Sequence, residues 1–237
     1  MLDLHTHLLP EIDDGARNFP ETLKIIKKEM EDGVQQIVVT PNFISQLYEP
    51  TVQEIQEGLT LVKKALTELD WPVEILPGME VRLSPDLFSQ YNLGDFLTIN
   101  QTRYLLVDLF ETPLVEVAPV LDEMIAGNLW PILAHPEKYV EVQENTEILN
   151  PWLKKHVLFQ VSTDSLSGLW GKKVQSTAEK LILERMVHIL ATDVHNPFRN
   201  FVPLSYGLEI ARRLIGEDAE LLVAQNCDMI VQGKSLF

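Results

Sequence analysis

Short apolar stretches rich in β-branched residues alternate along this chain with longer segments of helical periodicity. The apolar stretches predict strands at residues 2–8, 36–41, 73–82, 104–110, 130–135, 157–162 and 187–193. Helices are predicted at residues 20–32, 51–69, 114–126, 146–155, 172–185, 204–215 and 218–225, with Asn18 capping the first and Gly33 ending it. This alternation predicts an α/β fold with a mainly parallel sheet.

The predicted strands are almost continuously apolar, which is typical of strands buried on both faces. A closed barrel and an open doubly wound sheet both fit this pattern. Closure has one advantage, because it places the first strand beside the last. We therefore favour a barrel of about seven strands, with chemistry at the carboxyl ends of the strands. No linker or repeat divides the chain, so residues 1–237 are expected to form one domain.

Composition narrows the class of protein. Apolar residues make up 46% of the chain, and no apolar run reaches the roughly 18 residues of a membrane span. The net charge of −16 disfavours nucleic acid as a partner. The single cysteine, Cys227, cannot form an internal disulfide, and no signal-peptide pattern opens the chain, so a cytoplasmic location is expected. The oligomeric state stays open.

Two pairs of metal-binding side chains lie at opposite ends of the chain. His5 and His7 end the first predicted strand, and Asp193 and His195 end the last. Residues two apart in a strand point to the same side, so each pair presents two ligands to one point. Adjacent first and last strands would bring all four ligands together. A metal-dependent enzyme is therefore the leading hypothesis.

Three further candidates lie in or after other predicted strands: Glu80, Asp108 and His135. Asp108 on its own could instead pair with Arg82 or Arg103, since a buried carboxylate is costly unless it is paired. Mixed imidazole and carboxylate ligands suit Mn²⁺, Fe²⁺, Co²⁺ or Zn²⁺. The candidates exceed what one ion needs. Two or three ions, about 3.5–4 Å apart, would activate water to hydroxide and stabilise phosphoryl oxygens.

Several motifs in chain order resemble those of the PHP-family bacterial protein-tyrosine phosphatases of capsule and exopolysaccharide operons. They are the segments 3–16 (DLHTHLLPEIDDGA), 40–41 (TP), 48–50 (YEP), 78–82 (GMEVR), 97–106, 134–139 (AHPEKY), 165–173 and 191–196 (ATDVHN). The resemblance spans most of the chain. It implies a distorted (β/α)₇ barrel and hydrolysis of phosphotyrosine on a protein, the expected partner being the tail of a polysaccharide-synthesis tyrosine kinase.

The resemblance also implies a ligand set for three ions, with Mn²⁺ the expected metal. The first ion would be held by His5, His7, Glu80 and Asp193, the second by Glu80, Asp108 and His135, and the third by Asp14, Asn42 and His195. Arg199 and Lys138 would bind the substrate phosphate. His195, or a metal-bound water, would assist the leaving tyrosyl oxygen.

Three positions depart from the family pattern. Asn42 replaces a histidine and is a poor ligand for a transition metal, Asp108 replaces a glutamate, and Lys138 replaces an arginine and loses bidentate geometry. Two alternatives stay open: a small-molecule phosphomonoesterase of the histidinol-phosphatase kind, and a weakly active regulatory barrel that has lost the third ion.

Overall fold

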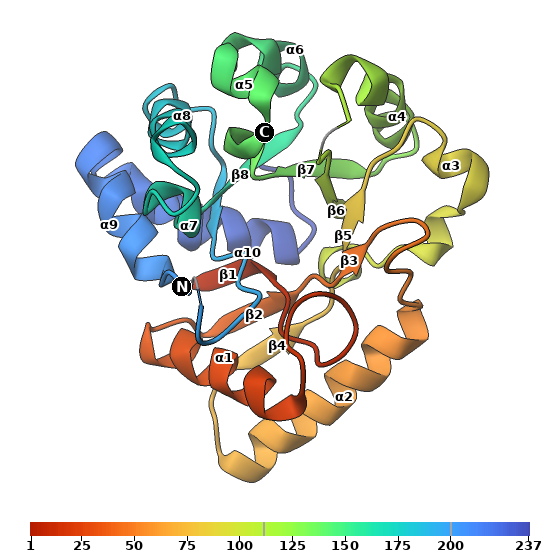
Figure 1. The fold of residues 1–237 in the computed structure, drawn as a ribbon, viewed down its shortest axis with the longest axis vertical. Coiled ribbons are helices and arrows are strands. Elements are labelled where there is room, and N and C mark those ends of the chain that lie inside the picture. Colours follow the sequence, from red (N-terminus) through yellow and green to blue (C-terminus); the bar gives the residue numbers. More distant parts are fainter. Residues whose placement is uncertain (111, 200) are drawn as a thin grey trace.

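Two parallel sheets form the centre of the computed structural model, which describes residues 1–110, 112–199 and 201–237 (Figure 1). One sheet has the strand order β1-β2-β4 and the other β3-β5-β6-β7-β8-β9. The strands are β1 (Leu2–Thr6), β2 (Gln36–Val39), β3 (Asn42–Phe43), β4 (Glu74–Leu76), β5 (Glu80–Arg82), β6 (Tyr104–Asp108), β7 (Trp130–Ala134), β8 (Leu158–Ser162) and β9 (Ile189–Ala191).

Helices surround the strands (Figure 1). They are α1 (Phe19–Glu31), α2 (Val52–Leu69), α3 (Leu87–Gln90), α4 (Leu114–Ala126), α5 (Val140–Glu144), α6 (Asn150–Leu153), α7 (Thr163–Leu166), α8 (Lys172–Leu183), α9 (Leu204–Ile215) and α10 (Gln225–Val231). The α/β prediction is confirmed. Asn18 caps α1 as expected, since its side chain accepts a hydrogen bond from the Glu21 backbone N–H at 3.0 Å. Within the described ranges, no helix has the length and apolar character to cross a membrane.

The predicted strand 73–82 is wrong as a continuous element, because it breaks into β4 and β5, which join different sheets. The predicted strand 36–41 is shorter in the structure: β2 ends at Val39, and the chain then continues into β3 of the other sheet. Pro41 and Pro77 lie at the breaks and carry no backbone N–H for a ladder. At the break after Pro77, a Cβ on Gly78 would lie 2.9 Å from Val38 Cγ1, so only glycine allows the chain to pass there.

Two predicted helices also differ from the structure. Residues 146–155 form a 3₁₀ turn at Thr146–Leu149 followed by the short α6. Residues 218–225 fall mostly in a 3₁₀ segment at Gly216–Val223. Asn150-Pro151 explains the first change, because proline removes a donor that a continuous helix would need.

The first strand lies beside the last, as expected. Thr6 and Val194 form a parallel bridge. The Asp193 N–H donates to the His5 carbonyl at 3.0 Å, and the His7 N–H donates to the Val194 carbonyl at 2.9 Å. These bonds join the two sheets at the point where the candidate ligands of both chain ends lie.

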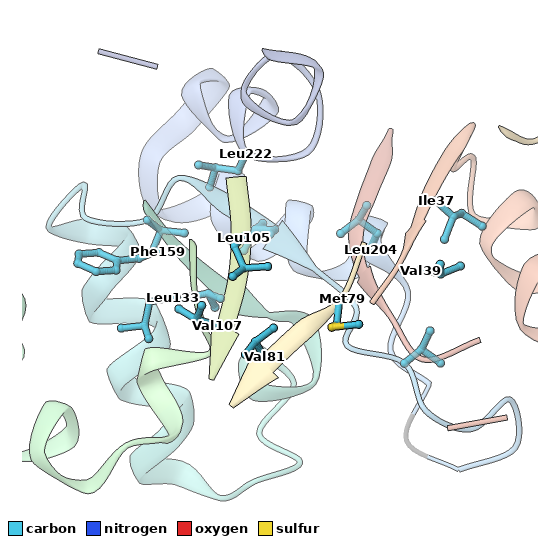
Figure 2. Packing of buried hydrophobic residues seen from close by; sticks show 14 of the residues in the cluster. Ile37, Val39, Met79, Val81, Leu105, Val107, Leu133, Phe159, Leu204 and Leu222 are labelled. Carbon is cyan, nitrogen blue, oxygen red and sulfur yellow. The ribbon is translucent and has the colours of Figure 1, made fainter. Parts of the chain in front are cut away.

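Strands in both sheets bury both of their faces. Figure 2 shows one layer of the core, in which alternate residues such as Ile37 and Val39, or Leu105 and Val107, pack together. The intervening Val38 and Leu106 belong to a second buried cluster that includes Ile230 of α10. Burying each such side chain stabilises the fold by about 1.5–3 kcal/mol. This rigid core fixes the strand ends, and the polar side chains gather there.

Candidate active site

Four side chains from distant parts of the chain converge at the carboxyl end of β1. The His5 Nε2 lies 3.0 Å from the His7 Nε2, 3.2 Å from Glu80 Oε2 and 3.3 Å from Asp193 Oδ1. The His7 Nε2 lies 3.4 and 3.5 Å from the same two carboxylate oxygens. Four ligands at about 2.1 Å from one ion would stand about 3.4 Å apart in a tetrahedron. The spacing therefore matches a shared cation.

The other nitrogens of both rings fix which atoms face the centre. The His5 Nδ1 lies 2.9 Å from Gln160 Oε1, and the His7 Nδ1 lies 2.6 Å from Asp13 Oδ2. Both partners accept, so each Nδ1 carries the proton and each Nε2 presents a lone pair. Two lone pairs 3.0 Å apart repel each other unless a proton or a metal cation lies between them. The donor set therefore fits a metal ion.

The pKa shifts and the unpaired polar atoms at this centre also favour a bound cation. Burial alone would lower the pKa of His5, but the carboxylates of Glu80 and Asp193 outweigh burial and raise it. Burial would raise the pKa of Glu80, but the surrounding imidazoles hold that pKa well below its ordinary value. In the described part of the chain, Asp193 Oδ1 and His135 Nδ1 are buried with no hydrogen-bond partner. A cation bound near these two atoms would give them the partner that they lack.

Glu80, Asp108 and His135 form a second cluster beside the first. Their ligand atoms lie within 4.8 Å of one another. The His135 Nε2 is 3.2 Å from Glu80 Oε1, so Glu80 faces both clusters with different oxygens. Asp108 also makes the alternative contact, because Arg82 Nε donates to its Oδ2 at 3.3 Å. The Tyr139 hydroxyl lies 2.9 Å from Asp108 Oδ1 and orients it.

The third cluster is formed by His7, Asp14 and His195. The His195 ring stacks on the His7 ring at 3.8 Å, and its Nε2 lies 3.7 Å from Asp14 Oδ1. Its Nδ1 donates to the Asp193 carbonyl at 3.0 Å, so its Nε2 keeps a lone pair. Asn42 reaches the same place, but its Nδ2 donates to Asp14 Oδ1 at 2.9 Å. Its amide therefore pairs with a candidate ligand.

A pocket of about 1030 Å³ opens over the three clusters and is lined by Arg82, Lys138 and Arg199. Arg199 is exposed. Lys138 is mostly buried, and its Nζ donates to Asp193 Oδ2 at 2.8 Å and lies 3.6 Å from Asp164 Oδ2. Three cations above an acidic floor suit a ligand that carries negative charge into the pocket.

The strand-alternation argument is only partly right about how the ligands are placed. Asp108 ends β6, but His7, His135 and Asp193 lie just beyond their strands, and Glu80 begins β5. His135 and Asp193 adopt positive φ angles of 34° and 56°. Left-handed residues at strand ends turn the chain sharply, and such strain is typical of functional sites. The ligands converge as predicted, but turns after the strands, and not alternation within them, place His135 and Asp193.

Three supporting residues were not among the predicted site residues. Asp13 and Gln160 orient the two histidines, and Asp164 contacts Lys138. Gln160 carried a usable signal, because an amide in the apolar stretch 157–162 is costly to bury without a partner. Asp13 lies beside Asp14 in a turn, where either carboxylate could have faced the site. Asp164 gave no such signal.

The chain is similar in sequence to known tyrosine-protein phosphatases. Tyrosine-protein phosphatase YwqE of Bacillus subtilis (strain 168) is 26% identical over 100% of this chain and 94% of its own length. Tyrosine-protein phosphatase CpsB of Streptococcus agalactiae (serotype III, strain NEM316) is 24% identical over 94% of this chain and 98% of its own.

Solved structures match the fold. A crystal structure from a study of YwqE of Bacillus subtilis and CpsB of Streptococcus pneumoniae, described there as metal-dependent tyrosine phosphatases, superposes with a TM-score of 0.93 at 24% identity, over 100% of this chain and 96% of that one. Histidinol phosphate phosphatase of Lactococcus lactis, solved with zinc, L-histidinol and phosphate, gives a TM-score of 0.61 at 15% identity, over 90% and 93%.

A sequence profile for the family described as capsular polysaccharide synthesis, CpsB/CapC, matches residues 1–232. This match covers nearly the whole chain and includes every candidate ligand described above. The chain therefore belongs to the CpsB/CapC family.

Proposed function

We propose that this protein is a metal-dependent phosphatase that hydrolyses phosphotyrosine on a protein substrate. One observation carries the proposal: the ring nitrogens of His5 and His7 and the carboxylate oxygens of Glu80 and Asp193 converge at 3.0–3.5 Å, which is the spacing of ligands around one cation. Family membership adds the substrate class, since curated relatives are named tyrosine-protein phosphatases. We also infer that residues 1–237 form one domain whose two sheets act as a distorted seven-stranded barrel.

The residues fit two or three divalent ions. His5, His7, Glu80 and Asp193 would hold the first ion, Glu80, Asp108 and His135 the second, and Asp14 and His195, with Asn42 beside them, the third. Mn²⁺ is the metal that we propose, and Fe²⁺, Co²⁺ and Zn²⁺ suit the same ligands. Bound ions would supply an activated water as nucleophile and would neutralise charge developing on the phosphoryl oxygens.

The protein's own cations orient the substrate. Arg199 is exposed at the pocket, where its guanidinium suits a phosphate that enters from solvent. Lys138 lies deeper, between Asp193 and Asp164, and would bind phosphate as a point charge. Cys227 takes no part in this proposal, because it is fully buried away from the pocket.

The role of His195 follows from its hydrogen bonds. Its Nδ1–H is used by the Asp193 carbonyl, so its free Nε2 suits a metal ligand in the third cluster. Assistance to the leaving tyrosyl oxygen is a further role that we propose for His195; it requires an Nε2 that carries a proton and binds no ion, and a metal-bound water is the other source of that proton. A His195→Gln enzyme that keeps full rate and full metal content would eliminate both roles.

The physiological partner that we propose is the phosphorylated tyrosine-rich tail of a kinase for polysaccharide synthesis, in keeping with the family description. We also infer a cytoplasmic location, because the lone buried thiol of Cys227 has no partner cysteine.

Turnover on matched substrates tests the proposed function. Purified protein with Mn²⁺ should release phosphate from a phosphotyrosyl peptide faster than from histidinol phosphate or a phosphoseryl peptide. Preference for histidinol phosphate would favour a small-molecule phosphomonoesterase. Absence of hydrolysis on all three, with metal bound, would favour a regulatory barrel and overturn the proposal.

A further inference from the structure

Trp170 is an exposed aromatic side chain at the pocket that none of the metal or phosphate roles uses. It lines the pocket and is 54% exposed. Its ring centre lies 4.9 Å from Lys138 Nζ. A large indole that remains open to solvent beside a phosphate-binding cation is a contact surface for a flat, apolar group carried by that phosphate.

The indole is held in place from behind. Its Nε1–H donates to Asp164 Oδ2 at 2.5 Å, and the Asp164 side chain is itself almost fully buried. The same oxygen lies 3.6 Å from Lys138 Nζ. One buried carboxylate therefore orients both the aromatic ring and the cation, so the distance between them is fixed before a ligand arrives.

The loop that carries Trp170 is short and pinned at both ends. It joins α7 to α8, and the Leu169 N–H donates to the Asp164 carbonyl at 3.2 Å. Gly168 and Gly171 adopt positive φ angles of 81° and 94°, and the Gly171 N–H donates to the Gly168 carbonyl at 2.9 Å. This tight turn presents the side chain of Trp170 toward the pocket while the neighbouring Leu169 lies outside the pocket lining.

We propose that Trp170 forms an aryl subsite, which binds the ring of an aromatic phosphate monoester while Lys138 binds its phosphate, and that Asp164 is the positioning residue for both. The proposal rests on the proposed function and adds the reason for aryl preference: stacking on an indole favours a phenyl ring over an alkyl chain. Phe110 also lines the pocket, but the Arg82 guanidinium lies 4.2 Å from its ring. Because this ring already contacts a cation, we assign Phe110 a smaller contribution than Trp170 to binding of the aryl ring.

Binding of two non-hydrolysable probes tests the subsite independently of turnover. Phenylphosphonate and methylphosphonate share the charged group and differ only in the ring. Calorimetry on Mn²⁺-loaded protein should show tighter binding of phenylphosphonate. Trp170→Leu should weaken phenylphosphonate roughly tenfold, about 1.4 kcal/mol, and change methylphosphonate less than twofold. Trp170→Phe should restore most of the loss.

Variants at Leu169, Asp164 and Phe110 test the assignment further. Leu169→Ala alters the same loop outside the pocket and should bind both probes like the wild type. Asp164→Asn keeps an acceptor for the indole N–H and should keep the phenyl preference, whereas Asp164→Ala should lower it. Equal weakening of both probes by Trp170→Leu, no weakening, or a larger loss of phenyl preference in Phe110→Leu would overturn the aryl subsite.

The outcomes separate this proposal from the proposed function. If the wild type prefers phenylphosphonate through Trp170 yet hydrolyses no phosphotyrosyl peptide, the subsite stands and the phosphatase proposal fails. If it hydrolyses the peptide but binds both phosphonates equally, the phosphatase proposal stands and the subsite fails.

Discussion

Asp13 holds the ring of His7 through a 2.6 Å hydrogen bond between its Oδ2 and the His7 Nδ1. The same carboxylate accepts the backbone N–H groups of Asn42 and Gly15 at 2.8 and 2.9 Å. One buried acid therefore ties the loop after β1 to β3 and sets the tautomer of a candidate metal ligand.

Replacing Asp13 by Asn should weaken metal binding about 10- to 100-fold. The amide fits the same space but keeps only one acceptor, whereas the Asp13 Oδ2 serves the His7 Nδ1 and the Asn42 N–H and the Oδ1 serves the Gly15 N–H. With the amide oxygen on the Gly15 N–H, the NH₂ group faces the His7 Nδ1 and moves the ring proton to Nε2. Titration of metal-free protein with Mn²⁺ measures the change. The exposed Asp122, which pairs with Lys155, offers a matched control as Asp122→Asn. Wild-type affinity in Asp13→Asn would contradict the assigned tautomer.

Asn42→His should strengthen binding of the weakest ion about tenfold, which is about 1.4 kcal/mol, and should raise the rate of phosphate release. The reason is that the present amide donates to Asp14 Oδ1, whereas an imidazole offers a lone pair to the same cluster. Stoichiometry of bound Mn²⁺ and turnover on a phosphotyrosyl peptide check this together. If neither changes, position 42 is not a ligand position.

Gly15→Ala should displace the loop after β1 and destabilise the protein by about 1–3 kcal/mol. A Cβ there would lie 2.0 Å from the His7 carbonyl oxygen and 2.6 Å from its Cβ. Because the strain falls on His7, the increase in melting temperature on adding Mn²⁺ should also shrink. Gly94→Ala is the control, since a Cβ at Gly94 meets no atom within 4 Å. Equal melting curves for the two variants would be the contrary result.

His188 should make the protein sensitive to acid. Its Nδ1 accepts a hydrogen bond from the Phe159 N–H at 3.1 Å, and burial lowers the pKa of His188 from 6.5 to about 4. As the pH falls, the unfolded chain protonates His188 before the folded protein does. The contribution of His188 to stability is therefore fully present above pH 6.5 and is lost as the pH falls toward 4. The free energy of unfolding should fall by roughly 2 kcal/mol between about pH 7 and about pH 5 through this group.

Urea unfolding of metal-free wild type and His188→Asn at both pH values measures that loss. Asparagine keeps an acceptor for the Phe159 N–H but does not titrate, so the variant should lose about 2 kcal/mol less on acidification. Identical losses in the two proteins would show that His188 is not the titrating group.

The sequence predicts much of this fold because its signals are local. Strands such as β6 and β8 are buried on both faces, so their apolar runs are almost unbroken. The breaks at Pro41 and Pro77 were harder to predict, since an apolar stretch with one proline also fits a bent strand. The position of the break is determined by a tertiary contact, the close approach of Gly78 to Val38. The weak helices near residues 150 and 220 depend on packing in the same way.

The candidate site likewise combines features that the sequence predicts with features that only tertiary contacts determine. His5, His7, Asp193 and His195 were predicted to meet, and they do, because the first strand lies beside the end of the last, as the barrel prediction requires. Lys138 was expected to face substrate, but its pairing with Asp193 and Asp164 depends on three segments that only the fold brings together. No local pattern in the chain reveals that contact, or the place of Trp170 beside it.

Anomalous diffraction at the manganese absorption edge, from crystals grown with Mn²⁺, tests the central claim most directly. We predict strong peaks among His5, His7, Glu80 and Asp193 and among Glu80, Asp108 and His135, with a weaker third peak beside Asp14 and His195. A map without peaks at these clusters, in which Lys138 stays paired with Asp193 and Arg82 with Asp108, would contradict the metal centre and the function that depends on it.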